Sequence, residues 1–254
     1  MTKSDQAALD NHAAAALPPK FSILIPAHNE EKFIGKCLES IHAAARAYPH
    51  QVEIIVALNR CTDRTSEIAA SLGAVIVEQP EKSIAKTRNA AARASRGDII
   101  VTIDADSVMS PDMLVQIDQA ITSGKFIGGG VRIMPDRYSL GILFTAIVLI
   151  PILLFHRFSG GLFWCRRETF ETLGGFDETM VSVEDIDFSR RLRLYGKSRG
   201  LRFTTLWKPY IVTSTRKADY FGDWHLLRNP GLVVRLLSGR DRTAADQYYY
   251  DVRR

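Results

Sequence analysis

The stretch "KTRNAAARASRGDIIVTIDADS", residues 86–107, decides the fold class. Its Ala-rich first half lies between Ser83 and Gly97, which predicts a helix with an N-cap and a C-terminal stop. The following "DIIVTID" is an apolar, β-branched run typical of a buried strand. Two carboxylates, Asp104 and Asp106, come directly after it. A helix that leads into a buried strand predicts one step of a βαβ chain.

The upstream sequence repeats this pattern. Three further apolar runs, "FSILI", "VEIIVALN" and "AVIVEQP", alternate with the helical patterns "EEKFIGKCLESIHAAARAY" and "CTDRTSEIAASLG". Thr62 or Asp63 is a candidate N-cap of the second helix, and Gly73 a candidate stop. Four short strands alternating with helices predict a mostly parallel, Rossmann-like α/β sheet with helices on both faces.

Polar residues follow the ends of three predicted strands. Asn29, Asn59 and Asp104 each come just after an apolar run. Ligands of parallel sheets bind beyond the carboxyl ends of the strands. We therefore expect these three side chains to converge on one crevice.

The pair Asp104 and Asp106 predicts a cation site. Residues two apart on a strand point to the same side, so their mutual repulsion calls for a cation. Hard oxygen ligands favour Mg²⁺ or Mn²⁺, which typically take one or two carboxylates plus substrate phosphates. The alternative is that one Asp caps the helix predicted near "SPDMLVQIDQA", although Ser110 already suits that position.

A second acidic cluster lies in "VEDIDFSRRLRLYG". Glu184, Asp185 and Asp187 stand at the mouth of a predicted helix, where the helix dipole alone favours acidic residues. A carboxylate there also suits a general base that takes a proton from an acceptor hydroxyl.

Basic residues concentrate in the C-terminal half. The chain carries a net charge of +5, and nine Lys or Arg face a single acid between Asp187 and Lys217. This excess suits anionic ligands or an anionic membrane, is too small to imply nucleic acid, and also fits a solvated helix face. Arg88 can meet a pyrophosphate, and Arg216 with Lys217 can form a second clamp on a diphosphate or an anionic acceptor. His225 is either a metal ligand or an ordinary satisfied histidine.

The apolar segment 139–155, "SLGILFTAIVLIPILLF", has no charge in 17 residues. Its length is at the lower limit for a membrane span, and a single crossing would separate Asp104 and Asp106 from Asp185. Three alternatives stay open: an embedded interfacial helix that contacts the membrane or a lipid acceptor, a helix in the protein core, and an oligomer contact.

The remaining features bound the organisation of the chain. Three widely spaced cysteines argue against a disulfide framework or a zinc site and favour a reducing, cytoplasmic compartment. Residues 1–19 lack the apolar region of a secretory signal and are predicted to be a mobile tail. The expected domain is 20–235, with a nucleotide-sugar half at 20–125, an acceptor half at 126–235 and a C-terminal tail at 236–254.

Five stretches resemble, in order and spacing, the motifs of family 2 glycosyltransferases with the GT-A fold. They are "ILIPAHNEE", "VALNRCTDRT", "KTRNAAARASRGDIIVTIDADS", "LGGFDE" and "VEDIDFSRRLRLYG", within about residues 20–217. The resemblance implies a metal-assisted, inverting transfer of a sugar from a nucleotide-diphosphate donor. The acceptor stays open, with polyprenyl phosphates and small soluble sugars as candidates.

The resemblance also implies roles for individual residues. Asp106 would bind the metal, Asp104 would lie near the ribose or the metal, and Asp185 would be the catalytic base beside Glu184. The other implied roles are a nucleotide pocket lined by Pro26, His28 and Glu30, Asn59 facing the base, Arg88 approaching the nucleotide, and an acceptor-side loop of Gly174, Gly175 and Phe176.

One departure concerns the base. Family members commonly carry an acidic pair after the second strand, where this chain has Leu58 and Asn59. A uridine donor is therefore only the family default. A nucleotidyltransferase is a rival, disfavoured because "PAHNEEKF" is acidic and lacks the expected Gly-rich basic loop. A non-catalytic sugar-nucleotide-binding module is a third alternative.

Overall fold

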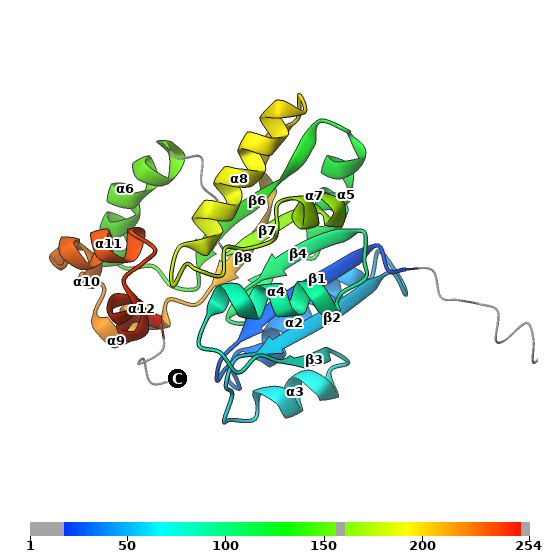
Figure 1. Ribbon diagram of the computed structural model, residues 1–254. Helices are drawn as coiled ribbons and strands as arrows, with labels where there is room; N and C mark the ends of the chain where they lie inside the picture. Colours follow the sequence, from blue (N-terminus) through cyan, green and yellow to red (C-terminus); the bar gives the residue numbers. More distant parts are fainter. Residues whose placement is uncertain (1–17, 156–160, 250–254) are drawn as a thin grey trace, which may run out of the picture.

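The computed structural model describes residues 18–155 and 161–249. Figure 1 shows one central sheet with helices on both sides and a group of C-terminal helices beside α6 at one end. Most of the tail predicted at 1–19 lies outside the described residues.

The N-terminal half is the predicted parallel sheet. Its strands lie in the order β3-β2-β1-β4, and all three pairings are parallel. The strands are β1 (Phe21–Ala27), β2 (Val52–Leu58), β3 (Val75–Glu78) and β4 (Ile99–Ile103), and the helices between them are α2 (Ile34–Ala45), α3 (Thr65–Ser71) and α4 (Ile84–Ala94). The mostly parallel α/β class is confirmed.

The starts of two helices test the capping predictions. Ser83 caps α4 as predicted, because its hydroxyl accepts a hydrogen bond from the Lys86 amide. The predicted cap of α3 is wrong by one residue, since Arg64 holds the N-cap position. Asp63 nevertheless accepts the Thr65 amide at 3.0 Å, which satisfies one of the free donors at that helix end.

The second half of the sheet is mixed. The strand β7 is antiparallel to both β4 and β6, whereas β8 is parallel to β6 and antiparallel to β5. The remaining strands are β5 (Ser107–Met109), β6 (Phe126–Pro135), β7 (Leu162–Arg166) and β8 (Arg202–Thr213), and the helices that pack here are α5 (Met113–Thr122), α7 (Arg167–Thr172) and α8 (Glu184–Ser198). No sequence pattern predicted the short β5.

The two faces of the sheet carry separate apolar cores. Along β1, Ile23 and Ile25 pack with α2 and α5 on one face, whereas Leu24 packs with α4, α7 and α8 on the other. This alternation follows from the period of two in a strand. Because both faces are covered, β1 is buried along its whole length.

The apolar segment forms helix α6 (Leu140–Phe155). Side chains are described along its first half, and Leu140, Leu143, Phe144, Ile147 and Val148 are exposed. Core burial, one of the three alternatives for 139–155, is therefore wrong for these positions. Among the described residues, no helix combines the length and the apolar character needed to cross a bilayer.

The C-terminal segment ends in further helices. They are α9 (Arg216–Phe221), α10 (His225–Arg228), α11 (Pro230–Leu237) and α12 (Arg242–Tyr249). The last of these falls within the range 236–254 predicted to be a tail. An ion pair of 3.0 Å between Lys82 and Asp246 connects α12 to the start of the α4 region.

Gly129 tests the contact between β6 and β8. A Cβ at Gly129 would lie 1.8 Å from the backbone oxygen of Thr204, so any side chain must push the two strands apart. We expect Gly129→Ala to lower the free energy of unfolding by about 3 kcal/mol, as overpacked cores do. Chemical denaturation measures this, with Gly231→Ala as the control because no atom lies within 4 Å of its Cβ position. Equal stability of the two variants would contradict the packing described.

Candidate active site

A cavity that gathers most of the predicted site residues lies at the carboxyl ends of β1, β2 and β4. It also receives residues from the start of α8 and from the segment after β8. Of the residues predicted for the site, the lining includes Pro26, His28, Glu30, Asn59, Arg88, Asp104, Asp106, Glu184, Asp185, Arg216 and Lys217. The expectation that polar side chains converge at this edge is confirmed for Asn59 and Asp104.

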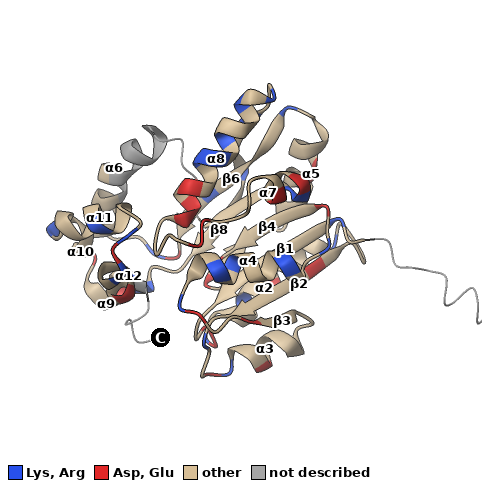
Figure 2. Ribbon diagram, in the orientation of Figure 1, with Lys and Arg blue, Asp and Glu red and all other residues tan. Residues whose placement is uncertain are grey.

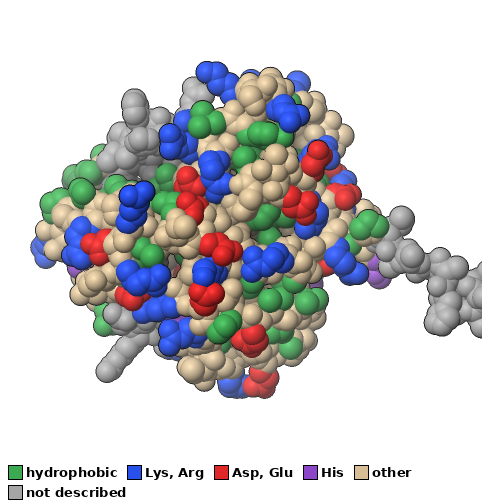
Figure 3. All heavy atoms as spheres, viewed as in Figure 1, with side chains coloured by type: hydrophobic (Ala, Val, Ile, Leu, Met, Phe, Trp, Pro, Cys, Tyr) green, Lys and Arg blue, Asp and Glu red, His purple; other side chains and the backbone are tan. Residues whose placement is uncertain are grey.

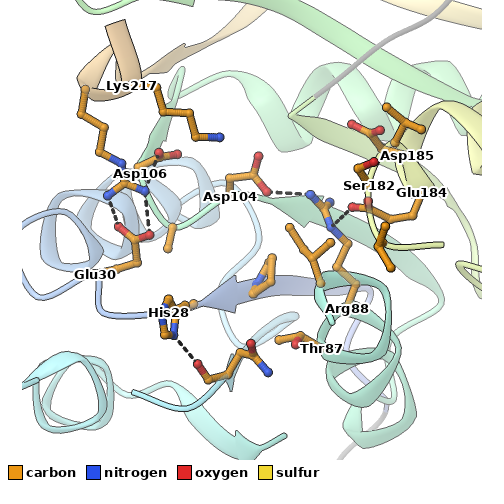
Figure 4. A pocket seen from close by; sticks show the side chains of 18 residues that line it. His28, Glu30, Thr87, Arg88, Asp104, Asp106, Ser182, Glu184, Asp185 and Lys217 are labelled. Carbon is orange, nitrogen blue, oxygen red and sulfur yellow. Dashed lines mark hydrogen bonds and ion pairs between the residues drawn. The ribbon is translucent and has the colours of Figure 1, made fainter. Parts of the chain in front are cut away.

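Arg88 is a buried cation between two acidic groups. Its side chain is only 2% exposed, and a guanidinium nitrogen lies 2.8 Å from Asp104 Oδ1. Its Nε lies 3.4 Å from Glu184 Oε1 (Figure 4). Arg88 therefore links the end of β4 to the first turn of α8.

Arg216 makes a second bridge on the opposite side of the cavity. It donates to both carboxylate oxygens of Glu30, at 2.5 and 2.7 Å, and lies 3.0 Å from Asp106 Oδ2. The β5–β8 pairing explains the contact, because it aligns Ser107 with Thr213 and lets the Ser214 amide donate to the Asp106 carbonyl. The chain after β8 is thereby laid across Asp106.

The acidic side chains at the end of β4 fit a divalent cation. Burial, together with the nearby Asp104 and Glu30 carboxylates, raises the pKa of Asp106 to about 6 although Arg216 opposes the shift. Among the described residues, no group of three or more His, Cys, Asp or Glu side chains is arranged to hold a metal. The two carboxylates of Asp104 and Asp106 suit an ion that takes one or two protein carboxylates and completes its coordination shell with diphosphate oxygens.

Glu184 and Asp185 are adjacent acidic residues at the start of α8. Glu184 is buried, and burial with the neighbouring Asp185 raises its pKa to about 7. Burial also raises the pKa of Asp185, whereas Arg88 opposes the shift. The Ile186 amide donates to Asp185 Oδ1 at 2.8 Å and orients the carboxylate. Figure 2 shows these acids at the start of α8 and basic residues farther along it.

Asn59 and His28 shape the cavity wall. The Asn59 amide donates to the backbone oxygens of Gln79 and Glu81, at 2.9 and 2.5 Å. A ring nitrogen of His28 lies 2.6 Å from the Asn59 carbonyl of the main chain. The Asn59 NH₂ group therefore holds the loop after β3 in place.

The loop of Gly174, Gly175 and Phe176 does not line this cavity; it lines a separate hollow behind it. The Asn89 side chain accepts the Phe176 amide at 2.9 Å and donates to its carbonyl at 2.8 Å. The Phe176 ring lies 5.4 Å from the Arg88 guanidinium carbon. In this structure the loop packs against Arg88, and the acceptor-side role implied for its three residues stays a prediction.

Sequence patterns missed residues 181–183, which also line the cavity. The Val181 amide donates to Gly239 O at 2.9 Å, and the Ser182 hydroxyl donates to Leu236 O at 2.8 Å. The end of α11 therefore holds this wall. Val183 lies just before α8 and has a φ of 54°, in the left-handed region. A β-branched residue rarely adopts this conformation, so the sequence does not predict it.

His225 lies outside the site. Its ring stacks on Phe221 at 4.7 Å and borders a different hollow, formed by α9 to α12. This position agrees with an ordinary surface histidine.

Solved structures define the class of the fold, which is that of GT-A glycosyltransferases. The structure resembles S. aureus TarS in complex with UDP-GlcNAc, with a TM-score of 0.61 and 19% identity, covering 90% of this chain and 70% of that chain. It equally resembles mannosyltransferase PcManGT from Pyrobaculum calidifontis in complex with GDP-Man and Mn²⁺, with a TM-score of 0.61, 19% identity and coverage of 93% and 71%.

The family model named Glycosyl transferase family 2 matches residues 22–173, and the chain belongs to that family. Among curated relatives, probable glycosyltransferase YdaM of Bacillus subtilis is 27% identical, over 91% of this chain and 61% of that protein. An undecaprenyl-phosphate 4-deoxy-4-formamido-L-arabinose transferase of Pseudomonas fluorescens is 28% identical, over 44% of this chain and 35% of that protein. The chain thus spans less than two thirds of the length of these relatives.

Arg88 provides a test of the buried ion bridge. We expect Arg88→Met to lower the free energy of unfolding by about 3 kcal/mol or more, because Glu184 and Asp104 lose their buried counter-charge. The loss should grow from pH 5 to pH 8, because Arg88 stabilises the ionised form of Glu184, whose pKa of about 7 leaves it mostly neutral at pH 5. Denaturation at both pH values measures this.

Arg93→Met is the matched control, because Arg93 lies on the same helix with its side chain 64% exposed. A loss of stability in Arg88→Met that is independent of pH would contradict the electrostatic role.

Proposed function

We propose that this chain transfers a sugar from a nucleotide-diphosphate sugar to a hydroxyl acceptor, by a single displacement that inverts the anomeric carbon. One observation carries the proposal: Asp104 and Asp106, at the end of β4, share a cavity with Asp185 at the start of α8. If the diphosphate of the donor binds at Asp104 and Asp106, the sugar of the donor would face Asp185. A uridine donor is the starting hypothesis, as the family default.

The donor end of the cavity combines negative and positive groups suited to a diphosphate. Asp106, together with Asp104, would hold Mn²⁺ or Mg²⁺, and the bound ion would neutralise charge on the departing nucleotide diphosphate. Arg216 and Lys217 line the same cavity, so their side chains would donate charge-assisted hydrogen bonds to the diphosphate.

Asp185 is the proposed general base. A raised pKa makes its carboxylate a better proton acceptor than an exposed Asp, and a base must lie within hydrogen-bond reach of the acceptor hydroxyl. Glu184, also predicted to be catalytic, contacts Arg88 and is buried, which supports a role in holding α8 against β4.

The acceptor and the compartment are further parts of the proposal. A lipid-linked acceptor is supported by the undecaprenyl-phosphate transferase among the relatives and by the exposed apolar face of α6. We propose that the reaction takes place at the cytoplasmic face of a membrane. The free thiols of Cys37, Cys61 and Cys165 suit a reducing compartment.

Calorimetric titration tests the donor site. We expect UDP or GDP to bind more tightly with Mn²⁺ than without it, and Asp106→Asn to reduce that gain by at least roughly tenfold because a first ligand is lost. Asp98→Asn is the matched control, since Asp98 is exposed just before the opposite end of the same strand. Binding indifferent to Mn²⁺ would count against a metal-assisted glycosyltransferase, and a preference for nucleoside triphosphates would favour the nucleotidyltransferase.

Asp185→Asn tests the chemical step. The variant should bind donor as the wild type does, whereas kcat for transfer to an acceptor should fall roughly a hundredfold to ten-thousandfold, because no group accepts the proton. Asp187→Asn is the control, because Asp187 lies on the same helix turn and pairs with Arg191 at 2.5 Å. Unchanged kcat in Asp185→Asn, measured with polyprenyl phosphates and soluble sugars as acceptors, would remove Asp185 from the role of base.

A further inference from the structure

Helix α6 presents an apolar face to solvent. Leu140, Leu143, Phe144, Ile147 and Val148 are each between 49% and 70% exposed. Their spacing of three and four residues places them on one side of the helix. We call the surface formed by these five side chains the α6 apolar face. Surface helices normally turn their polar side to water, whereas here the apolar side faces water.

The rest of the protein holds the helix in this orientation. A Cβ at Gly141 would lie 2.6 Å from Asp223 Cβ, so only glycine permits this close approach to the loop before α10. The Phe144 ring lies 5.7 Å from the Trp224 ring. Because these contacts fix the helix, it cannot rotate to hide the apolar face.

Basic residues predominate in the two segments that form the surroundings of the α6 apolar face. The sequence contains no acidic residue between Asp136 and Glu168, and none between Asp223 and Asp241. The second of these segments carries exposed arginines at Arg228, Arg235 and Arg240. Figure 3 shows apolar and basic side chains together at this end of the molecule, over α10 and α11.

Two carboxylates near the base of α6, those of Asp219 and Asp223, are neutralised by one arginine. Arg137, just before the helix, donates to Asp219 at 2.7 Å and lies 2.7 Å from Asp223. The side of the molecule that carries the α6 apolar face therefore combines exposed hydrocarbon, the half-exposed indole of Trp224 and the exposed arginines Arg228 and Arg240. Arg235 pairs with Asp241 at 2.6 Å.

We propose that the α6 apolar face docks on an anionic lipid bilayer. Hydrocarbon burial and attraction between arginines and anionic headgroups act together in such binding, and Trp suits the boundary between them. A second copy of the chain would bring like charges together, which disfavours self-association through this face.

Docking also has a consequence for the active site, which rests on the proposed function. Arg216, which contacts Glu30 and Asp106 in the cavity, is the first residue of α9, and Asp219 of that helix is tied to the base of α6 by Arg137. The bilayer would thus meet the part of the protein that adjoins the cavity, where an acceptor carried by a lipid phosphate can enter.

Vesicle flotation of the full chain tests the proposal. We expect the protein to float with vesicles of phosphatidylcholine and phosphatidylglycerol, and less with phosphatidylcholine alone. Leu143→Glu/Ile147→Glu should lower the partition coefficient by roughly tenfold or more, because two side chains no longer enter the hydrocarbon. Arg228→Glu/Arg240→Glu should lower it for anionic vesicles only, and added salt should reduce that contribution.

The matched control is Val75→Glu/Leu194→Glu, which changes two side chains with 52% and 51% exposure on β3 and α8. It should float as the wild type does. Thermal unfolding checks that each variant is folded. If Leu143→Glu/Ile147→Glu is not folded, Arg228→Glu/Arg240→Glu still tests the same surface.

Three results would overturn the proposal: a wild type that stays in the soluble fraction with both vesicles, flotation unchanged in both variants, or a dimer that Leu143→Glu/Ile147→Glu converts to monomer. Asp185→Asn should float normally. Flotation without transfer to any acceptor would therefore count against the proposed function alone.

Discussion

The site depends on a cation buried among carboxylates. Arg88 contacts Asp104 on one side and Glu184 on the other while its side chain is almost fully buried. Burial of an unpaired charge is costly, so the two acidic segments must stay beside the arginine for the fold to be stable. The ion bridge thus sets the distance between the strand end that would hold a diphosphate and the helix that carries Asp185.

Arg88 is itself held by groups outside the cavity. The Phe176 ring lies beneath the guanidinium, and the two hydrogen bonds between the Asn89 side chain and the Phe176 backbone hold that residue in place. A Cβ at Gly175 would lie 2.6 Å from Asn89 Oδ1, which explains a glycine with positive φ at this point. The loop that resembles an acceptor motif therefore acts here on the geometry of the donor end.

The N-terminal half could be predicted from the sequence, because local patterns determine it. Strand runs, Ser83 as a cap and polar residues after the strand ends are all readable within a few residues, and they led to the right sheet and to most of the cavity. The short β5 could not be predicted, since three residues carry no periodicity and its pairing partner β8 is about a hundred residues away. The wall at 181–183 depends on hydrogen bonds to carbonyls at the end of α11, which for Ser182 lie 54 residues farther along the chain, so no local pattern indicates them.

Repulsion among the buried carboxylates also affects the stability of the protein without a ligand. The pKa is raised to about 6 at Asp106 and to about 7 at Glu184. At pH values between the ordinary carboxylate pKa and these raised values, the folded chain therefore binds more protons than the unfolded chain. The stability of the donor-free protein must therefore fall as the pH rises through this range. At neutral pH, Arg216 offsets part of the repulsion by contacting both Glu30 and Asp106. A divalent cation at Asp106 would take over that contact, and the arginine would then be available to the diphosphate that arrives with the ion.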